Sequence, residues 1–161
     1  VNGVTYNNNG TTDNRAYVIK YADVNDPTVA NSDAHYPLMR YSEVLLTYAE
    51  AANEANSGPT TEAYKQLNAV RTRAAATEAP AGMTQEQFRS FVIAERAREF
   101  ALEGVRRFDL MRWGIYLQVM NKISAGQNNI SKVRSLRNLL LPIPQAELNS
   151  NPMITENNPG W

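Results

Sequence analysis

The sequence predicts an all-α protein: pairs of helices, long ordered loops and an irregular carboxy-terminal tail. Three observations predict this class. Apolar residues recur at spacings of three and four over two neighbouring segments, 38–56 and 60–75. The residues Ser-Gly-Pro at 57–59 separate these segments, which is typical of an antiparallel helical hairpin. Four of the eight prolines fall in the last 20 residues, so the tail cannot be helix or central strand throughout.

Composition and charge exclude several classes of function. A chain of 161 residues is enough for one domain, and we expect a single domain over 1–161. The 16 basic and 16 acidic side chains balance and are interspersed, which argues against a nucleic-acid partner. There is no cysteine for a thiolate metal site or nucleophile, and His35 is the only histidine, so we expect no metal and no cofactor.

The amino-terminal 36 residues are predicted to be mostly loop. Residues 1–14 show no apolar period, 15–21 fit one short strand or extended segment, and 23–33 are rich in turn formers. Asparagine occurs eighteen times in the chain, and it favours turns because its side chain mimics a backbone turn. Long ordered loops would explain the large number of asparagines. An alternative is that exposed amides beside tyrosines bind sugar hydroxyls.

Two helices form the predicted hairpin. The first follows Pro37, which suits a first helical turn, and the second runs from about residue 60 to 75. The apolar stripe of the first helix is expected to consist of Leu38, Tyr41, Leu45, Tyr48, Ala52 and Ala55. That of the second is expected to consist of Tyr64, Leu67, Val70 and Ala74.

A third helix is predicted to begin at a capping box. Thr84 and Gln87 have the spacing at which each side chain caps the other's backbone N–H. This helix should continue to about Glu103, with Gly104 at its carboxy-terminal cap. A short fourth helix is expected over 105–113 and a weaker continuation to Ile123, after which the chain is loop-like.

The third and fourth helices carry nine charged residues within 95–112. On a helical wheel of 100° per residue with Phe88 at zero, Glu95 falls near 340° and Glu99 near 20°, inside the apolar stripe. Buried carboxylates need strong donors. We therefore expect both to be buried and paired with nearby arginines, from the set Arg96, Arg98, Arg106, Arg107 and Arg112.

Two functional interpretations compete with a structural role for these carboxylates. Glu95, Glu99 or Asp109 could be the acid and nucleophile of a glycoside hydrolase, although such carboxylates usually line an open cleft. They could also bind metal, but the Glu-x-x-His pattern of helical carboxylate sites is absent. A structural network of ion pairs is favoured over both.

Aromatic side chains are the remaining candidates for a binding site, since sugars stack on exposed rings. Trp113 lies on the apolar side of its segment and is expected in the core, whereas the role of Trp161 stays open. Tyr6, Tyr17 and Tyr21 lie in loop or edge surroundings and are better stacking candidates. His35, at a helix start, is interpreted as a capping or surface residue.

Four blocks in order resemble the carboxy-terminal part of SusD/RagB-type proteins, the glycan-binding outer-membrane lipoproteins of Bacteroidetes. They are AYVIKY at 16–21, MRYSEVLLTYAEAANE at 39–54, LNAVRTRA at 67–74 and AERAREFALEGVRRFDLMRWG at 94–114, followed by an ending that contains LLPIPQAELNSNP. The resemblance covers about residues 15 to 161. Family members are several times longer and begin with a signal and a lipid-attached cysteine, so this chain looks like a carboxy-terminal piece.

The resemblance implies a fold and a function. It implies tetratricopeptide-like helix pairs, in which Ala51 and Ala63, twelve residues apart, would be the small contact positions. It also implies non-catalytic oligosaccharide or nutrient binding at the outer-membrane surface and delivery to a SusC-like TonB-dependent transporter. No motif carries a ligand-binding residue over to this chain. The alternatives are a helical-repeat adaptor for proteins and a glycoside hydrolase.

Overall fold

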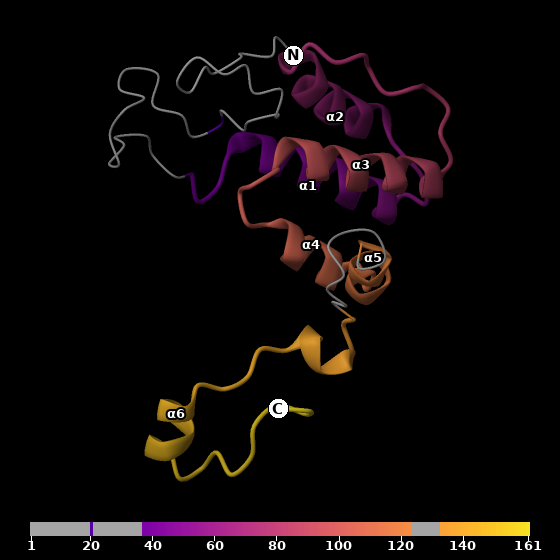
Figure 1. The fold of residues 1–161 in the computed structure, drawn as a ribbon. Coiled ribbons are helices and arrows are strands. Elements are labelled where there is room, and N and C mark those ends of the chain that lie inside the picture. The colour runs from indigo at the N-terminus through magenta and orange to yellow at the C-terminus, as the bar shows by residue number, and fades with distance from the viewer. Residues whose placement is uncertain (1–19, 21–36, 124–132) are drawn as a thin grey trace, which may run out of the picture. The chain divides into compact units, whose positions relative to one another are not determined.

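The computed structural model describes Lys20, residues 37–123 and residues 133–161 (Figure 1). The chain divides into two compact units, Val1–Arg40 and Tyr41–Trp161. The described elements of the second unit are all helical and confirm the predicted class. They are α1 (Tyr41–Ala55), α2 (Thr61–Arg73), α3 (Gln85–Glu99), α4 (Arg106–Arg112), α5 (Tyr116–Ile123), the 3-10 turn η1 (Leu136–Leu139) and α6 (Gln145–Ser150).

Helix α1 packs against both α2 and α3 (Figure 1). The turn 56–60 joins α1 to α2, so the two helices form the predicted antiparallel hairpin. Helix α3 is also antiparallel to α1. Its first residue accepts a hydrogen bond from Asn53 near the end of α1, through the Gln85 carbonyl at 3.1 Å. Near its other end, Arg96 donates to the Thr47 hydroxyl in the first half of α1, at 3.3 Å.

The core lies where these three helices meet. Tyr64 of α2 and Phe88 of α3 pack edge to face, with ring centroids 5.0 Å apart. The Tyr64 hydroxyl accepts a hydrogen bond from the Met83 backbone N–H at 2.9 Å, which ties the α2–α3 connection to α2. The buried cluster consists of Leu46, Ala49, Ala63, Leu67, Val70, Ala79, Phe88, Val92 and Phe100.

The predicted apolar stripe of α1 is correct only in part: Leu45 and Ala52 pack against the core, and its other members are exposed. The buried residues of α1 are Ser42, Leu46, Ala49 and Asn53, while Tyr41 is 75% exposed. The pattern misled because α1 is apolar on two sides and its inner side includes two polar residues. Asn53 can be buried there because its amide donates to the Gln85 carbonyl.

The predicted contact between Ala51 and Ala63 is wrong for the same reason. Ala63 is fully buried, but Ala51 lies on the exposed side of α1. Ala49 is the fully buried alanine of α1. The hairpin therefore has small residues in its core, although not at the spacing that the tetratricopeptide resemblance implies.

The start of α3 agrees with the sequence better than its end. The capping box is confirmed: the Thr84 hydroxyl accepts from the Gln87 N–H at 3.3 Å, and the Gln87 side-chain oxygen accepts from the Thr84 N–H at 2.9 Å. Helix α3 ends at Glu99, four residues earlier than predicted. Gly104, with φ of +78°, belongs to the connection to α4 and is not the cap of α3.

We expect Thr84→Ala to lower the free energy of unfolding by about 1 kcal/mol, within the range of about 0.5–2 kcal/mol for a lost amino-terminal cap. Urea unfolding followed by circular dichroism measures this change. Thr61→Ala is the matched control, because Thr61 is the exposed first residue of α2. This substitution should change the free energy of unfolding by less than about 0.5 kcal/mol. Equal effects of the two substitutions would contradict the capping assignment.

The carboxy-terminal tail is irregular, as predicted, and neither η1 nor α6 contains a buried residue. Asparagine side chains order it instead. The Asn157 side chain both accepts from the Ile143 N–H at 2.8 Å and donates to the Ile143 carbonyl at 3.3 Å. Asn158 donates to the Leu141 carbonyl at 2.6 Å. In the tail, asparagine therefore serves loop structure, as the sequence indicates.

Two polar contacts tie the start of the tail to the helices. The Asn121 side chain donates to the Arg134 carbonyl at 3.0 Å and accepts from its N–H at 2.7 Å. Arg107 of α4 donates to the Asn138 carbonyl at 3.2 Å. The tail is thus held by hydrogen bonds and not by burial in the core.

Candidate functional site

Glu95, the first candidate catalytic carboxylate, is closed off from solvent. It lies on the inner face of α3, where the residue is 4% exposed. Its Oε2 atom accepts hydrogen bonds from Arg71 of α2 and, at 2.7 Å, from Arg98. Arg71 is itself buried, donates to the Thr77 carbonyl at 2.6 Å and lies 4.9 Å above the centroid of the Phe91 ring.

Glu99, the second candidate, is half-buried as a residue, although its side chain is only 7% exposed. Both of its carboxylate oxygens accept from Nη2 of Arg73, at 2.6 and 2.5 Å. Arg73 differs from Arg71 in that its side chain is 58% exposed. The predicted burial is confirmed for Glu95 and for the side chain of Glu99, as is Arg98 as a partner of Glu95.

The principal partners of the two glutamates were not predicted. Arg71 and Arg73 come from α2, whereas the expected arginines follow in or after α3. A signal was present, because a helical wheel of α2 places Arg71 about 40° from Leu67, on the apolar side of its helix. An arginine on the apolar face of one helix and a glutamate on the apolar face of the following helix indicate a buried ion pair.

Asp109, the third candidate, binds two arginines. Its Oδ2 and Oδ1 atoms accept from Arg96 Nε and Nη2 at 2.8 and 3.0 Å, in a two-pronged pair that is almost fully buried. Arg112 Nε donates to the same carboxylate at 2.9 Å. Arg112 also reaches Glu50 of α1 at 2.7 Å, so these side chains join α4 to both α3 and α1.

This geometry fixes structure and is poorly suited to acid–base chemistry. A catalytic carboxylate pair must flank a space that a substrate can enter. Here the oxygens of Glu95, Glu99 and Asp109 face guanidinium groups, and neither glutamate lines either of the hollows described below. Within the described residues, no group of three metal-ligating side chains is positioned to hold a metal ion.

An exposed pair joins the end of α1 to the start of α3. Arg89 donates from Nε and Nη2 to the two oxygens of Glu54, at 2.7 and 2.5 Å. These hydrogen bonds from Arg89 hold the pKa of the Glu54 carboxyl below its ordinary value, against the opposing effect of burial. A lowered pKa in the folded state stabilises the fold above the unfolded-state pKa, and this contribution disappears as the pH falls through the folded pKa.

We expect Arg89→Gln to raise the pKa of Glu54 toward its ordinary value. The pKa is measured by following the Glu54 side-chain carbon in an NMR titration of both proteins. The stability difference between wild type and variant should be present at neutral pH and vanish once the pH is below the folded-state pKa of Glu54. A Glu54 titration that is identical in both proteins would contradict the assignment.

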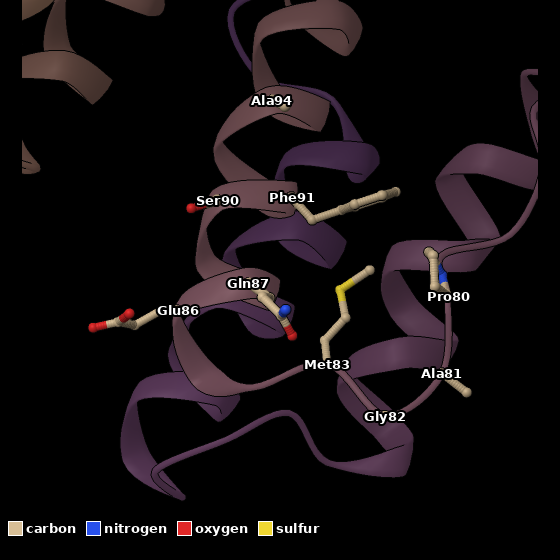
Figure 2. Close-up of a pocket in the computed structure, with 9 residues that line it drawn as sticks. All are labelled: Pro80, Ala81, Gly82, Met83, Glu86, Gln87, Ser90, Phe91 and Ala94. Atoms are coloured by element: carbon tan, nitrogen blue, oxygen red, sulfur yellow. The ribbon is translucent and has the colours of Figure 1, made fainter.

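A hollow of about 720 Å³ lies between α3 and the preceding loop. Figure 2 shows the Met83 and Phe91 side chains between α3 and the preceding loop. The polar side chains of the lining are those of Glu86, Gln87 and Ser90. The side-chain oxygen of Gln87 is occupied in the capping box. The lining is mostly apolar, which differs from a sugar site, where several polar groups converge on one cavity.

A smaller hollow of about 400 Å³ lies among α1, α3 and α4. Its lining includes Glu43, Thr47, Arg96, Asp109 and Arg112, which already bind one another, and the exposed ring of Phe108 stands on its rim.

Both tryptophans make contacts within the chain. The Trp113 ring lies near two arginines, with Arg112 at 4.6 Å from its centroid, and its Nε1 donates to Glu50 at 2.7 Å. It is partly buried but outside the core cluster in which it was expected. Trp161 donates to the Arg137 and Leu140 carbonyls at 3.0 and 3.2 Å. These hydrogen bonds join the end of the tail to residues near its start.

Tyr6, Tyr17, Tyr21 and His35 lie outside the described residues. The interpretations of these four side chains stay predictions. Among the helices that are described, none has the length and hydrophobicity that a bilayer crossing requires.

Comparison with known proteins identifies the relatives of the chain. It is 37% identical over 139 residues to SusD-like protein P25 of Formosa agariphila, covering 82% of this chain and 25% of that protein. It is 35% identical over 129 residues to the starch-binding protein SusD of Bacteroides thetaiotaomicron, covering 78% and 21%. The chain thus spans between a fifth and a third of the curated relatives it matches.

Solved structures give the same result. A SusD homologue from Bacteroides thetaiotaomicron superposes with a TM-score of 0.69 at 33% identity, covering 86% of this chain and 31% of that structure. A SusD-like carbohydrate-binding protein from Bacteroides fragilis superposes with a TM-score of 0.57 at 31% identity, covering 70% and 27%. The model of the SusD family matches residues 2–161. The helical fold, the sequence relatives and this nearly complete match agree, and the chain belongs to the SusD family.

Proposed function

We propose that the full-length protein binds an oligosaccharide at the outer-membrane surface and delivers it to a SusC-like TonB-dependent transporter. The observation that carries this proposal is the match of the SusD family over residues 2–161. One relative is named a starch-binding protein and one structural neighbour a carbohydrate-binding protein, which supports a glycan as the ligand. A lipid anchor on the full-length protein would hold it at the membrane.

The arrangement of the carboxylates supports binding without catalysis. Glu95 and Asp109 are each held by two arginines and Glu99 by Arg73, and all three side chains are nearly buried. A hydrolase that used them would first have to break these ion pairs. Release of reducing ends from an oligosaccharide by the purified full-length protein would overturn the non-catalytic assignment.

We further propose that the glycan contacts lie outside the described helices. The rings of Phe91, Trp113 and Trp161 each have an arginine over one face. These contacts favour a structural role for the rings over sugar stacking. The described part of the chain then serves as a scaffold for contacts made elsewhere in the protein.

The full-length protein is therefore expected to bind its oligosaccharide at least about tenfold more tightly than the 161-residue chain, a difference of about 1.4 kcal/mol. Calorimetric titration of both proteins with the same oligosaccharide measures this. Equal affinities would place the site within residues 1–161, most simply around the tyrosines at 6–21. The absence of sugar binding by the full-length protein in a broad glycan screen would favour the helical-repeat adaptor instead.

Delivery to a transporter has its own test. The tagged full-length protein, purified from detergent-solubilised outer membranes, should carry a TonB-dependent β-barrel protein with it. A second preparation from cells that lack this transporter is the control, in which sugar affinity should be unchanged. Recovery of the tagged protein without any such barrel would contradict the delivery step while leaving glycan binding intact.

A further inference from the structure

Helices α4 and α5 bury apolar residues that do not belong to the core of α1–α3. Leu110 of α4 is 2% exposed and Tyr116 of α5 is 6% exposed. Both lie outside the apolar cluster in which α1, α2 and α3 meet. The tail is hydrogen-bonded to both short helices, through Arg107 of α4 and Asn121 of α5. We call residues 106–123 and 133–161, which hold α4, α5 and the tail, the carboxy-terminal arm.

The contacts that hold the arm to α1 and α3 are mostly polar. Asp109 of the arm forms its two-pronged ion pair with Arg96 of α3. Glu50 of α1 accepts hydrogen bonds from two side chains at the end of α4, those of Arg112 and Trp113, each at 2.7 Å. The arm is therefore attached to the three-helix core mainly by charged groups and hydrogen bonds.

Packing across the same interface is incomplete. The smaller hollow, of about 400 Å³, lies among α1, α3 and α4. Val105, just before α4, packs against the core, but the Phe108 ring one turn later is 69% exposed. A region with few buried apolar contacts opens locally at a lower free energy than a close-packed core does. The interface of the arm has this property.

Separation in water costs an ionic interface less than it costs an apolar core. Apolar groups that leave a core lose their stabilisation when water surrounds them. Charged groups such as Asp109 and Arg96 regain hydration, which offsets much of the lost ion pairing. The core of α1–α3, which contains Phe88 and Val92, has no such compensation. We therefore expect the arm to separate from α1–α3 while that core stays folded.

The connection from α3 to α4 provides a pivot for this movement. Leu102 has a φ of +66° and Gly104 a φ of +78°, so two residues of a short connection have left-handed backbone. This conformation is unfavourable for a bulky side chain such as that of Leu102. A rotation of α4 away from α1 and α3 would let Leu102 leave it. The strain at Leu102 therefore acts against the ion pairs that hold the arm.

We propose that the carboxy-terminal arm separates from α1–α3 in one cooperative event, and that the Glu50 carboxylate is the latch that holds it in place. Glu50 suits this role because it belongs to α1 and binds both Arg112 and Trp113 of the arm. In the separated state α1, α2 and α3 stay folded, and the hollow beside Thr47 is open to solvent. The arm thus has a second position relative to the helical core. This inference does not depend on which glycan the protein binds.

Hydrogen–deuterium exchange of the full-length protein, measured by mass spectrometry, tests the proposal. Glu50→Gln keeps the size of the side chain and removes the charge of the latch. Amide exchange should become about tenfold faster in peptides from α4 and by the same factor in peptides from α5, because both helices open in one event. Peptides from α2 and α3 should exchange at the wild-type rate. The matched control is Glu54→Gln, because Glu54 lies one turn further along α1 and pairs with Arg89 of α3.

The pattern of exchange distinguishes the possible results. Faster exchange in α4 but not in α5 would show that the two helices do not open together. Equal acceleration in α2 and α3 would mean that the whole fold is destabilised. Unchanged exchange in α4 and α5 would exclude Glu50 as the latch, and an equal effect of Glu54→Gln would show that any lost charge on α1 suffices. Each of these results overturns the proposal, whereas acceleration confined to the arm and specific to Glu50→Gln supports it.

Discussion

Glu95→Ala is expected to lower the free energy of unfolding by about 3–5 kcal/mol, the usual cost of removing one partner of a buried ion pair. The substitution strands Arg71, which is 9% exposed, so solvent compensates little for the lost carboxylate. Arg71 keeps its hydrogen bond to the Thr77 carbonyl, but this neutral acceptor does not balance the charge. Urea unfolding followed by circular dichroism gives the change in stability.

Two substitutions make the result for Glu95 specific. Glu62→Ala removes an exposed pair with Lys65 and should cost less than about 1 kcal/mol. Glu99→Ala should have an intermediate effect, because the arginine that it leaves, Arg73, is 58% exposed and stays hydrated. If Glu95→Ala is no more damaging than Glu62→Ala, the pair between Glu95 and Arg71 does not exist in solution. Replacing both Glu95 and Arg71 by apolar residues should recover most of the loss.

Phe88→Ala is expected to cost about 3–5 kcal/mol, the range for removing a large side chain from a packed core. Phe88 is fully buried and lies edge-on against Tyr64, so alanine would leave a cavity among three helices. Chemical denaturation of the variant measures the loss. Phe88→Leu fills most of the same space and should cost clearly less. Similar losses for the two variants would show that the site relaxes or that Phe88 is not in a shared core.

Local features of the fold could be predicted from the sequence because their causes are local. The Thr84 capping box depends on two residues three positions apart, and the inner face of α3 follows from the spacing of Phe88, Val92 and Glu95. The inner face of α1 could not be predicted in this way. Both sides of α1 are apolar, and the choice between them depends on where α2 and α3 pack, which is a property of the whole fold.

The candidate site shows the same division between local and distant causes. The burial of Glu95 follows from its place on its own helix, and Arg98, three residues away, follows from helix geometry. Arg71 is 24 residues away in sequence, and the partnership requires α2 and α3 to lie alongside each other. A glycan site built from loops depends still more on distant segments, so the sequence alone could identify the family but not the contacts.

The three carboxylates of α1 also restrict the handedness of the helical assembly. Two helices can flank a third in either of two mirror-related arrangements, and apolar faces alone distinguish these arrangements weakly. Glu43, Glu50 and Glu54 lie on only one side of α1. With α3 on the opposite side, none of them could reach its arginine, and Arg96 would lose one of its acidic neighbours. The carboxylates on one side of α1 thus favour one of the two mirror-related arrangements of the helices. Hydrophobic packing alone would distinguish these arrangements only weakly.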